Sequence, residues 1–369
     1  SVNRIEDIIE KIETITTNEQ YESIKASVNE NIVSNKININ FKIEETEKFF
    51  IQRINIFGNN VTRESVIRNQ IEIDEGDPFN EILYTKSINN IKSLNFFEEV
   101  KGEILDGSEF NTKIINLNIK EKATGEIFAG VGTGTDGSSF AFGVKENNYL
   151  GRGVKVDSDL NISEERVKGK FKVSNPNYKN SDKNLDFSLE ATSIDRAATS
   201  GYKSNVTGFS IGSQFEYLDD LRFGLSTRNT IEKISVDASA SSSQKKQDGN
   251  YFDSFIGLDF FYDKRNQKYQ TTSGFFNNYN VNIPILSETN TLTNNYSYKI
   301  FKELYENNVS TFAFSLKGAS SLSGDDIKLS ERLYIPGKKL RGFESGKIGP
   351  KDGSDFIGGN YVSTINATT

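Results

Sequence analysis

The chain has 369 residues and a net charge of −7, and it contains no Cys, His, Met or Trp. Without Cys and His it can form no disulfide, no Ser–His or Cys–His nucleophile pair and no ordinary zinc site, which argues against an enzyme. The negative charge argues against a general nucleic-acid binder.

No apolar run approaches the length of a membrane helix, and the mean hydropathy is −0.53. That excludes a helical membrane protein, but it leaves a transmembrane β-barrel open, because barrel sequences are polar on average. The chain opens at Ser1 directly into a helical pattern, with no Met and no leader-like segment. We therefore expect a mature piece or an internal fragment.

Residues 1–46 predict one helix followed by two strands. The segment RIEDIIEKIETI carries isoleucines at helical spacing, whereas KININFKIEE alternates as a strand does. This order matches the back half of the unit that follows it.

Residues 47–123 predict a complete β-α-α-β-β unit. FFIQRINIFG reads as a strand, and Thr62 is a candidate N-cap for a short helix after it. Pro78 suits the turn before a second helix. That second helix is expected to bury Tyr84, Ile88, Ile91 and Leu94. EEVKGEIL and TKIINLNIKE close the unit as two strands joined by a turn at Asp106-Gly107.

After residue 124 a period of two replaces the helical spacing. In VKGKFKV, Val167, Phe171 and Val173 share one face and the lysines share the other. We predict about twelve sequential strands, most of them roughly ten residues long. They lie near residues 126–134, 138–147, 154–162, 167–173, 185–191, 205–217, 221–232, 251–262, 275–285, 291–301, 309–319 and 356–369.

Two architectures fit this alternation: a soluble β-sandwich and an antiparallel barrel with lipid outside. Soluble strands usually have about five or six residues, whereas a tilted membrane strand needs roughly 9–11. Short links such as LDD (218–220) are interspersed with long polar ones such as SVDASASSSQKKQD (235–248). Both the strand lengths and the loop lengths favour the barrel.

The glycine-rich stretch GVGTGTDG (130–137) could suggest a phosphate-binding loop. Such a loop needs a helix directly after it, and here another strand follows. We interpret Gly130, Gly132 and Gly134 as parts of a glycine-weakened strand, with Asp136-Gly137 as its hairpin turn.

Two acidic stretches and one basic loop lie near the end of the chain. GDDIK (324–328) and KDGSD (351–355) lack the full spacing of a calcium loop, so we interpret them as solvated loop charge. YIPGKKLRGFESGKIGP (334–350) places lysines and Arg341 among glycines and prolines. It is either a surface turn or a loop held inside a polar barrel, where a guanidinium can bind a wall carboxylate through two hydrogen bonds.

LRGFESGKIGP and the following IGGN, expected as the start of a strand, resemble the signature of the BamA-type outer-membrane assembly family. Further fragments resemble the family in the same order along nearly the whole chain. INIFGNN (54–60) and SLNFFEEV (93–100) resemble parts of a POTRA domain, NNYLGRG (147–153) the turn between barrel strands two and three, and SNPNY (174–178) the turn after strand four. This ordered set strengthens the barrel prediction.

The resemblance implies a mainly β fold, in which α/β POTRA domains precede an antiparallel transmembrane β-barrel. Residues 1–46 would be the C-terminal part of one POTRA domain, 47–123 a complete one and 124–369 a barrel truncated before its last strands. The family barrel has sixteen strands, with a motif-bearing loop between the eleventh and twelfth. About twelve strands would then be present here, in an internal fragment.

Leu340, Arg341, Gly342 and Phe343 match the family's loop-six lumen motif. In the family this arginine reaches toward acidic groups of the barrel wall, and its partners are expected in the missing strands. The first barrel strand, 125–134, is the candidate seam where a client strand pairs. Its glycines, Gly130, Gly132 and Gly134, weaken its packing.

The resemblance implies folding and insertion of β-barrel proteins into the cell outer membrane, with the POTRA domains in the periplasm. The implied partners are unfolded outer-membrane proteins, accessory lipoproteins of the assembly complex and outer-membrane lipid. No nucleic acid, nucleotide, metal or other cofactor is implied. The main alternative is a related two-partner-secretion or autotransporter-assembly barrel. A porin, which needs no α/β front, and a soluble β-rich adhesin are more distant alternatives.

Overall fold

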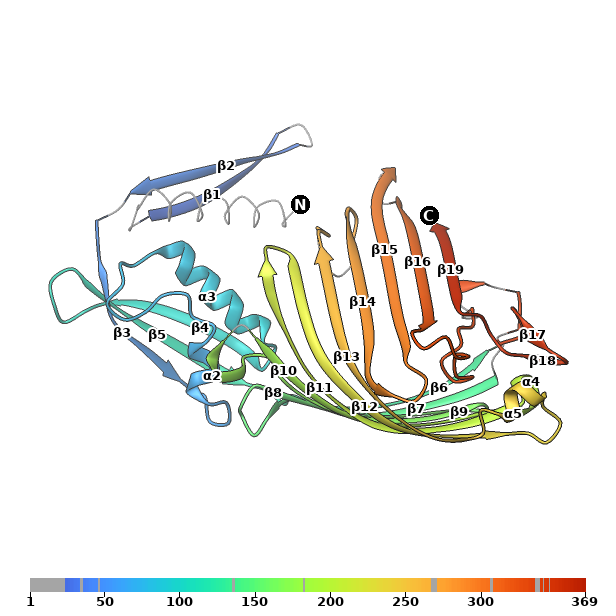
Figure 1. Cartoon of the computed structure of the whole chain (residues 1–369). Coiled ribbons are helices and arrows are strands. Elements are labelled where there is room, and N and C mark those ends of the chain that lie inside the picture. The colour runs from blue at the N-terminus through green and yellow to red at the C-terminus, as the bar shows by residue number, and fades with distance from the viewer. Residues whose placement is uncertain are drawn as a thin grey trace. The chain divides into compact units, whose positions relative to one another are not determined.

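The computed structural model describes residues 24–33, 36–45, 47–134, 137–181, 183–266, 271–305, 308–335, 339–340, 342–344 and 346–369 (Figure 1). The helix predicted in RIEDIIEKIETI lies outside these residues. The chain forms two compact units: Ser1–Gly125 with Asn147–Val154, and Glu126–Glu146 with Lys155–Thr369. Within the described residues, no helix is both long enough and apolar enough to cross a membrane.

The first unit contains the α/β elements. Strands β1 (Ile24–Val33) and β2 (Lys36–Glu45) pair antiparallel. The predicted β-α-α-β-β order follows as β3 (Phe50–Phe57), α2 (Glu64–Arg68), α3 (Glu81–Ser93), β4 (Phe97–Asp106) and β5 (Thr112–Glu121). Strand β5 lies in the middle of a three-stranded sheet, parallel to β3 and antiparallel to β4.

Helix α3 closes the core of this sheet. Its first turn is capped by Asn80, whose side chain accepts hydrogen bonds from the amides of Ile82 and Leu83. Ile88 and Ile91 are buried, as predicted, in a cluster with isoleucines of β3 and β5. The other two predicted core residues of this segment, Tyr84 and Leu94, are partly buried against the same cluster.

The N-cap prediction for Thr62 is wrong. Arg63 precedes α2 and makes no side-chain cap. Thr62 is only 2% exposed. Its hydroxyl accepts a hydrogen bond from Asn148 Nδ2 at 2.8 Å, and its amide donates to Glu121 Oε1 at 2.6 Å. Glu121 also accepts from the amides of the two residues before Thr62. A carboxylate distant in sequence therefore binds the free amides of this turn.

The turn in NNYLGRG belongs to the same unit. Gly151 has a φ of +68°, and a Cβ at this position would lie 1.9 Å from the carbonyl oxygen of Val61. The carbonyl of Gly151 accepts a hydrogen bond from the amide of Arg63 at 2.8 Å. Both the backbone conformation and the close approach require glycine here.

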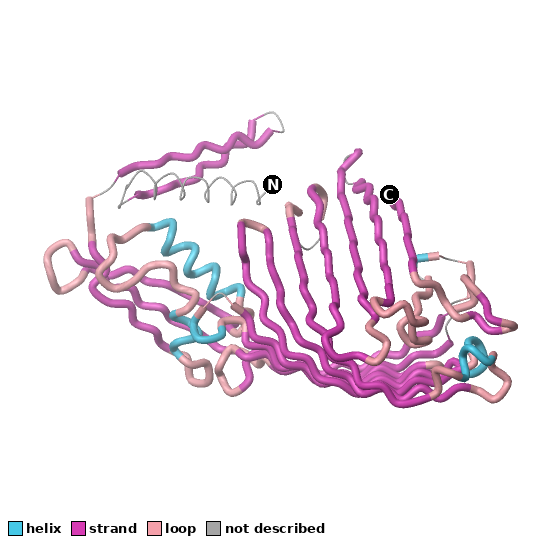
Figure 2. The backbone as a smooth tube through the Cα atoms, in the orientation of Figure 1, coloured by secondary structure: helices cyan, strands magenta, loops and turns pink. Residues whose placement is uncertain are grey.

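The described residues of the second unit form a twelve-stranded sheet and a separate two-stranded hairpin. The sheet confirms the predicted number of strands. Its strands are drawn in magenta in Figure 2. Each strand lies beside its neighbours in the chain. The strands are β6 (Gly125–Gly134), β7 (Gly137–Tyr149), β8 (Val154–Ser163), β9 (Arg166–Asn175), β10 (Asn184–Arg196), β11 (Tyr202–Leu218), β12 (Leu221–Val236), β13 (Gly249–Asp263), β14 (Gly274–Ser287), β15 (Thr291–Tyr305), β16 (Asn308–Ser321) and β19 (Tyr361–Thr368). Short helices η1 (Tyr178–Asn180), α4 (Ala197–Ser200) and α5 (Ser242–Lys245) lie in the connections.

The last predicted strand, 356–369, begins too early. Phe356 pairs instead within a small hairpin of β17 (Lys351–Asp352) and β18 (Asp355–Phe356). Gly358 has a φ of +73°, which interrupts an extended strand, and Gly359 bridges to Leu333. The IGGN segment is therefore a turn that precedes β19.

The sheet has one apolar and one polar face, as the period of two predicts. Phe171, Leu189 and Phe209 lie side by side on β9, β10 and β11 and are 38%, 46% and 42% exposed. On the other face, Lys172 forms an ion pair with Asp186 at 2.9 Å. We call these the apolar face and the polar face; a barrel with lipid outside uses this arrangement.

Candidate functional site

The candidate seam strand lies at an edge of the sheet. Among the described strands, β6 has β7 as its only neighbour, and β19 at the opposite edge pairs with β16. An edge strand presents N–H and C=O groups that can pair with another chain. Gly130, Gly132 and Gly134 all lie on β6.

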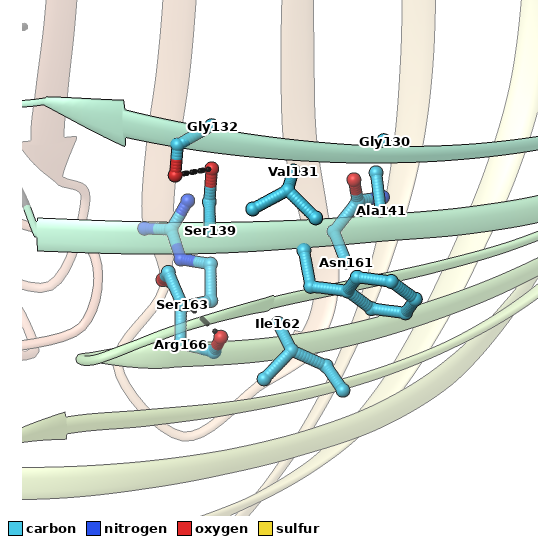
Figure 3. A pocket seen from close by; sticks show the side chains of 10 residues that line it. Gly130, Val131, Gly132, Ser139, Ala141, Asn161, Ile162, Ser163 and Arg166 are labelled. Atoms are coloured by element: carbon cyan, nitrogen blue, oxygen red, sulfur yellow. Dashed lines mark hydrogen bonds between the residues drawn. The ribbon is translucent and has the colours of Figure 1, made fainter.

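The second half of β6 is nearly bare of side-chain packing. A Cβ added at Gly130 would meet no atom within 4 Å, and one at Gly132 would meet only Ser139 Oγ, at 3.1 Å. Residues of β6, β7 and the β8–β9 hairpin line a pocket of about 210 Å³. Figure 3 shows Gly130 and Gly132 among the residues that line it. Another backbone could therefore approach this part of the strand closely.

In the first half of β6, Phe128 packs against the neighbouring strand. The ring of Phe128 covers Gly143 of β7, where an added Cβ would lie 2.3 Å from the ring. The other large apolar side chains of β6 pack little: Ile127 is 75% exposed, and Val131, between the glycines, is 78% exposed. Side-chain packing therefore holds β6 to β7 mainly at Phe128, before the glycines begin.

The second candidate feature is the long connection between β16 and β19, here called the β16–β19 loop. Of its motif, Leu340 is half-buried, Gly342 is exposed with a φ of +85°, and Phe343 is 55% exposed. Arg341 lies outside the described residues. The carbonyl of Lys339 accepts a hydrogen bond from Asn366 Nδ2 of β19 at 3.3 Å. Gly342 is suited to its position because its positive φ disfavours other residues.

The first arm of this loop carries a buried lysine that sequence reasoning missed. Lys328 is 2% exposed, and its Nζ lies 2.5 Å from Asp253 Oδ2 and 3.0 Å from Glu232 Oε2. It also lies 3.5 Å from Glu331 Oε1. The interpretation of GDDIK as solvated charge is therefore wrong for its lysine, although the two aspartates are exposed.

The electrostatics of this cluster keep the lysine charged. Burial on its own lowers the pKa of Lys328, but the carboxylates of Glu331, Glu232 and Asp253 outweigh it and raise the pKa above its ordinary value. For Glu331 itself, burial raises the pKa, against the lowering effect of Lys328. Lys328 stands between two apolar residues, Ile327 and Leu329, which are also buried. These apolar neighbours are the sequence pattern that could have indicated a buried lysine.

Further contacts hold the two arms of the loop to each other and to the sheet. Leu333 and Gly359 exchange backbone hydrogen bonds at 2.7 and 2.8 Å. Tyr334 donates from its hydroxyl to the Phe356 carbonyl at 3.0 Å, and the guanidinium of Arg196 lies 4.5 Å from the centre of the Tyr334 ring. Hydrogen bonds and ring contacts therefore hold the chain both before and after the motif.

Comparison with known families shows two matches in chain order. A POTRA family model, described as a surface antigen variable number repeat, matches residues 49–122. A model described as the Omp85 superfamily domain matches residues 148–367.

Among curated proteins, the chain is similar to outer membrane protein assembly factors BamA. It is 25% identical to that of Nitratidesulfovibrio vulgaris over 342 residues, covering 89% of this chain and 42% of the relative. It is 24% identical to that of Neisseria meningitidis serogroup B over 379 residues, covering 94% and 47%. The chain thus spans less than half the length of these relatives.

Among solved structures, BamA from Haemophilus ducreyi lacking POTRA domains 1–3 superimposes with a TM-score of 0.76 at 20% identity, covering 99% of this chain and 75% of that one. CdiB from Acinetobacter baumannii gives a TM-score of 0.52 at 10% identity, covering 93% and 66%. At these identities the likeness concerns the fold.

Proposed function

The chain belongs to the Omp85 superfamily, and we propose that the protein containing it folds β-barrel proteins and inserts them into the outer membrane. Its twelve-stranded sheet lies in that membrane, and its POTRA unit lies in the periplasm. The relatives named as BamA assembly factors support this, because they align with nearly the whole chain. Residues 1–46, 47–123 and 124–369 are proposed as a partial POTRA domain, a complete one and part of the barrel.

The observation that carries the proposal is the edge strand β6 with its bare glycine half. Unfolded membrane strands carry N–H and C=O groups that hydrocarbon cannot satisfy. An exposed edge offers such a strand hydrogen-bond partners while it enters the bilayer. Because Gly130 and Gly132 leave little side-chain packing to lose, pairing at this edge can be exchanged readily. This work is physical and requires no catalytic residue.

The β16–β19 loop is proposed to support the barrel from its polar interior. Arg341 would hold the loop motif against wall carboxylates, since a guanidinium can bind a carboxylate through two hydrogen bonds. Gly342 would supply the turn that presents it, in agreement with its φ of +85°. Leu340 and Phe343 would complete the motif on either side.

The POTRA unit is proposed to receive clients and accessory lipoproteins. Its sheet order, β3-β5-β4, leaves β3 and β4 as edges among the described strands. An extended segment of a partner can add to such an edge by main-chain hydrogen bonds.

The test uses the full-length protein with a photo-crosslinking residue at Val131 on β6 or, as the matched control, at Leu189 in the centre of the sheet. Both positions are exposed, at 78% and 46%. Crosslinks to newly made outer-membrane proteins are expected at Val131 and not at Leu189. Equal crosslinking at the two positions, or none at Val131, would overturn the proposed seam.

The same experiment separates the main alternative, a barrel that translocates a polypeptide through its lumen. A third probe at Lys170, which lies on the polar face opposite Glu190, reports on the interior. A client that crosslinks at Lys170 and not at Val131 would favour translocation over insertion at the seam.

A further inference from the structure

We propose that Lys328 is a second anchor of the β16–β19 loop, which holds the first arm to the barrel wall independently of the motif at 340–343. It acts as a positioning residue, because it fixes the chain segment that carries the motif. The proposal concerns how the loop is held, so it does not depend on which client the protein handles.

The wall is built to receive a cation at this point. Glu232 of β12 and Asp253 of β13 converge on the lysine from the polar face. Each carboxylate is held by a serine of a neighbouring strand: Ser204 donates to Glu232 Oε1 and Ser287 to Asp253 Oδ1, both at 2.5 Å. Residues of four consecutive strands, β11 to β14, therefore orient the two carboxylates without any contribution from the lysine.

The charge balance makes the lysine necessary. Three carboxylates, those of Glu232, Asp253 and Glu331, lie within 4 Å of one ammonium group. Removing the ammonium would leave the wall carboxylates facing each other with little water, which strongly destabilises a buried site. The first arm of the loop, which carries position 328, would then be bound less tightly to the wall.

The backbone beside Lys328 is fixed as well. The hydroxyl of Tyr202 donates to the Leu329 carbonyl at 3.1 Å, and the Leu329 amide donates to Gln247 Oε1 at 2.8 Å. Tyr202, Leu329 and Ile234 form a small buried cluster around this point. The lysine is therefore presented by a segment that is itself packed, as an anchor requires.

The two anchor points lie on different strands. Lys328 binds β12 and β13, whereas the described contact of the loop tip is the hydrogen bond from Asn366 of β19 to the Lys339 carbonyl. We therefore expect release of the tip to leave the contacts of Lys328 intact, and loss of Lys328 to leave the contact of the tip intact. This separation is the basis for expecting independent effects.

The test measures tryptic cleavage after Lys338 or Lys339 in the full-length protein, assembled in membranes and checked first for folding. Lys328→Met is expected to speed cleavage at least tenfold. A neutral-cage variant, Lys328→Met with Glu232→Gln, Asp253→Asn and Glu331→Gln, has no stranded carboxylate but also lacks the anchor, so its loop should be cleaved within about threefold of the Lys328→Met rate. Lys172→Met is the matched control, since its ion pair with Asp186 does not touch the loop.

Several results would overturn the proposal. Unchanged cleavage in Lys328→Met would show that the lysine holds nothing. Cleavage of the neutral cage at the wild-type rate would also overturn it, because the stranded carboxylates and not the lost anchor would then explain the effect of Lys328→Met. If Lys328→Met does not assemble, the neutral-cage variant must assemble and be cleaved roughly tenfold faster than wild type for the proposal to stand. Finally, the fold-increases of Lys328→Met and Arg341→Ala should multiply in the double variant, and a double variant no faster than either single would refute their independence.

Discussion

Leu189 lies near the middle of β10, 46% exposed, between Phe171 of β9 and Phe209 of β11. If this apolar face meets lipid, an arginine at position 189 must enter hydrocarbon. Near the bilayer midplane such a substitution costs about 2–4 kcal/mol. Since about 1.4 kcal/mol corresponds to a factor of ten, Leu189→Arg should lower the ratio of folded to unfolded protein roughly 30- to 700-fold.

The assay is urea-dependent folding of the full-length protein into lipid vesicles, followed by the shift in gel mobility between folded and heated samples. Phe171→Arg should behave like Leu189→Arg, because the two side chains are neighbours on the same face. The controls are Ser188→Arg and Lys170→Arg on the polar face. Ser188→Arg loses one hydrogen bond, to Ser210, so a cost of about 1 kcal/mol is expected there.

The refuting result is equal tolerance. If arginine at 189 and arginine at 188 have the same effect, the apolar face does not contact lipid. The exposed row of Phe171, Leu189 and Phe209 would then need a protein partner, and the soluble sandwich would again be the better architecture. A cost confined to the apolar face would distinguish a membrane sheet from that alternative.

Three further predictions concern single residues. Gly151→Ala should destabilise the first unit by more than about 1 kcal/mol in urea unfolding, because of its positive φ and the 1.9 Å approach of a Cβ to the Val61 carbonyl oxygen. Burial acts to raise the pKa of Glu121, but hydrogen bonds from Thr62 and the two preceding amides outweigh it and lower the pKa. The stabilisation by Glu121 is therefore full above the unfolded-state pKa and is lost as the pH falls through the folded-state pKa. Glu121→Gln should remove this fall in the free energy of unfolding at acid pH. Arg341→Lys should impair growth in a strain depleted of its own assembly factor nearly as much as Arg341→Ala, since losing the guanidinium fork costs about 2–5 kcal/mol. Lys339→Ala should change stability by only about 0.5 kcal/mol. Normal growth with Arg341→Ala beside failure with Lys339→Ala would contradict this assignment.

Local periodicity predicted the fold well, because it depends on which side of an element meets the core or the solvent. The helical spacing of Ile88 and Ile91 located the buried face of α3, and the alternation around Phe171 located the apolar face of β9. Both are properties of residues close in sequence. The same alternation placed the candidate seam glycines on one strand and indicated the twelve strands in order.

The errors arose where partners lie far apart in the chain. Thr62 is bound by Asn148, 86 residues away, so its hydroxyl is not available as a helix cap. Lys328 is bound by Glu232, 96 residues away, and no local pattern reveals that pairing. The segment at Gly358 forms a turn and not the predicted strand, because its bridge to Leu333 depends on how the loop arms meet. Sequence patterns report the faces of an element, whereas these features depend on what the fold brings against them.

The contacts along β6 bear on the proposed function. Phe128 covers Gly143 of β7, whereas Gly130 and Gly132 contribute almost no side-chain contact. Separating this glycine half from a partner would therefore lose mainly backbone hydrogen bonds, which an incoming strand can replace one for one. The proposed exchange of strands at β6 requires that the rest of the wall stays rigid, and an anchored β16–β19 loop would supply that rigidity.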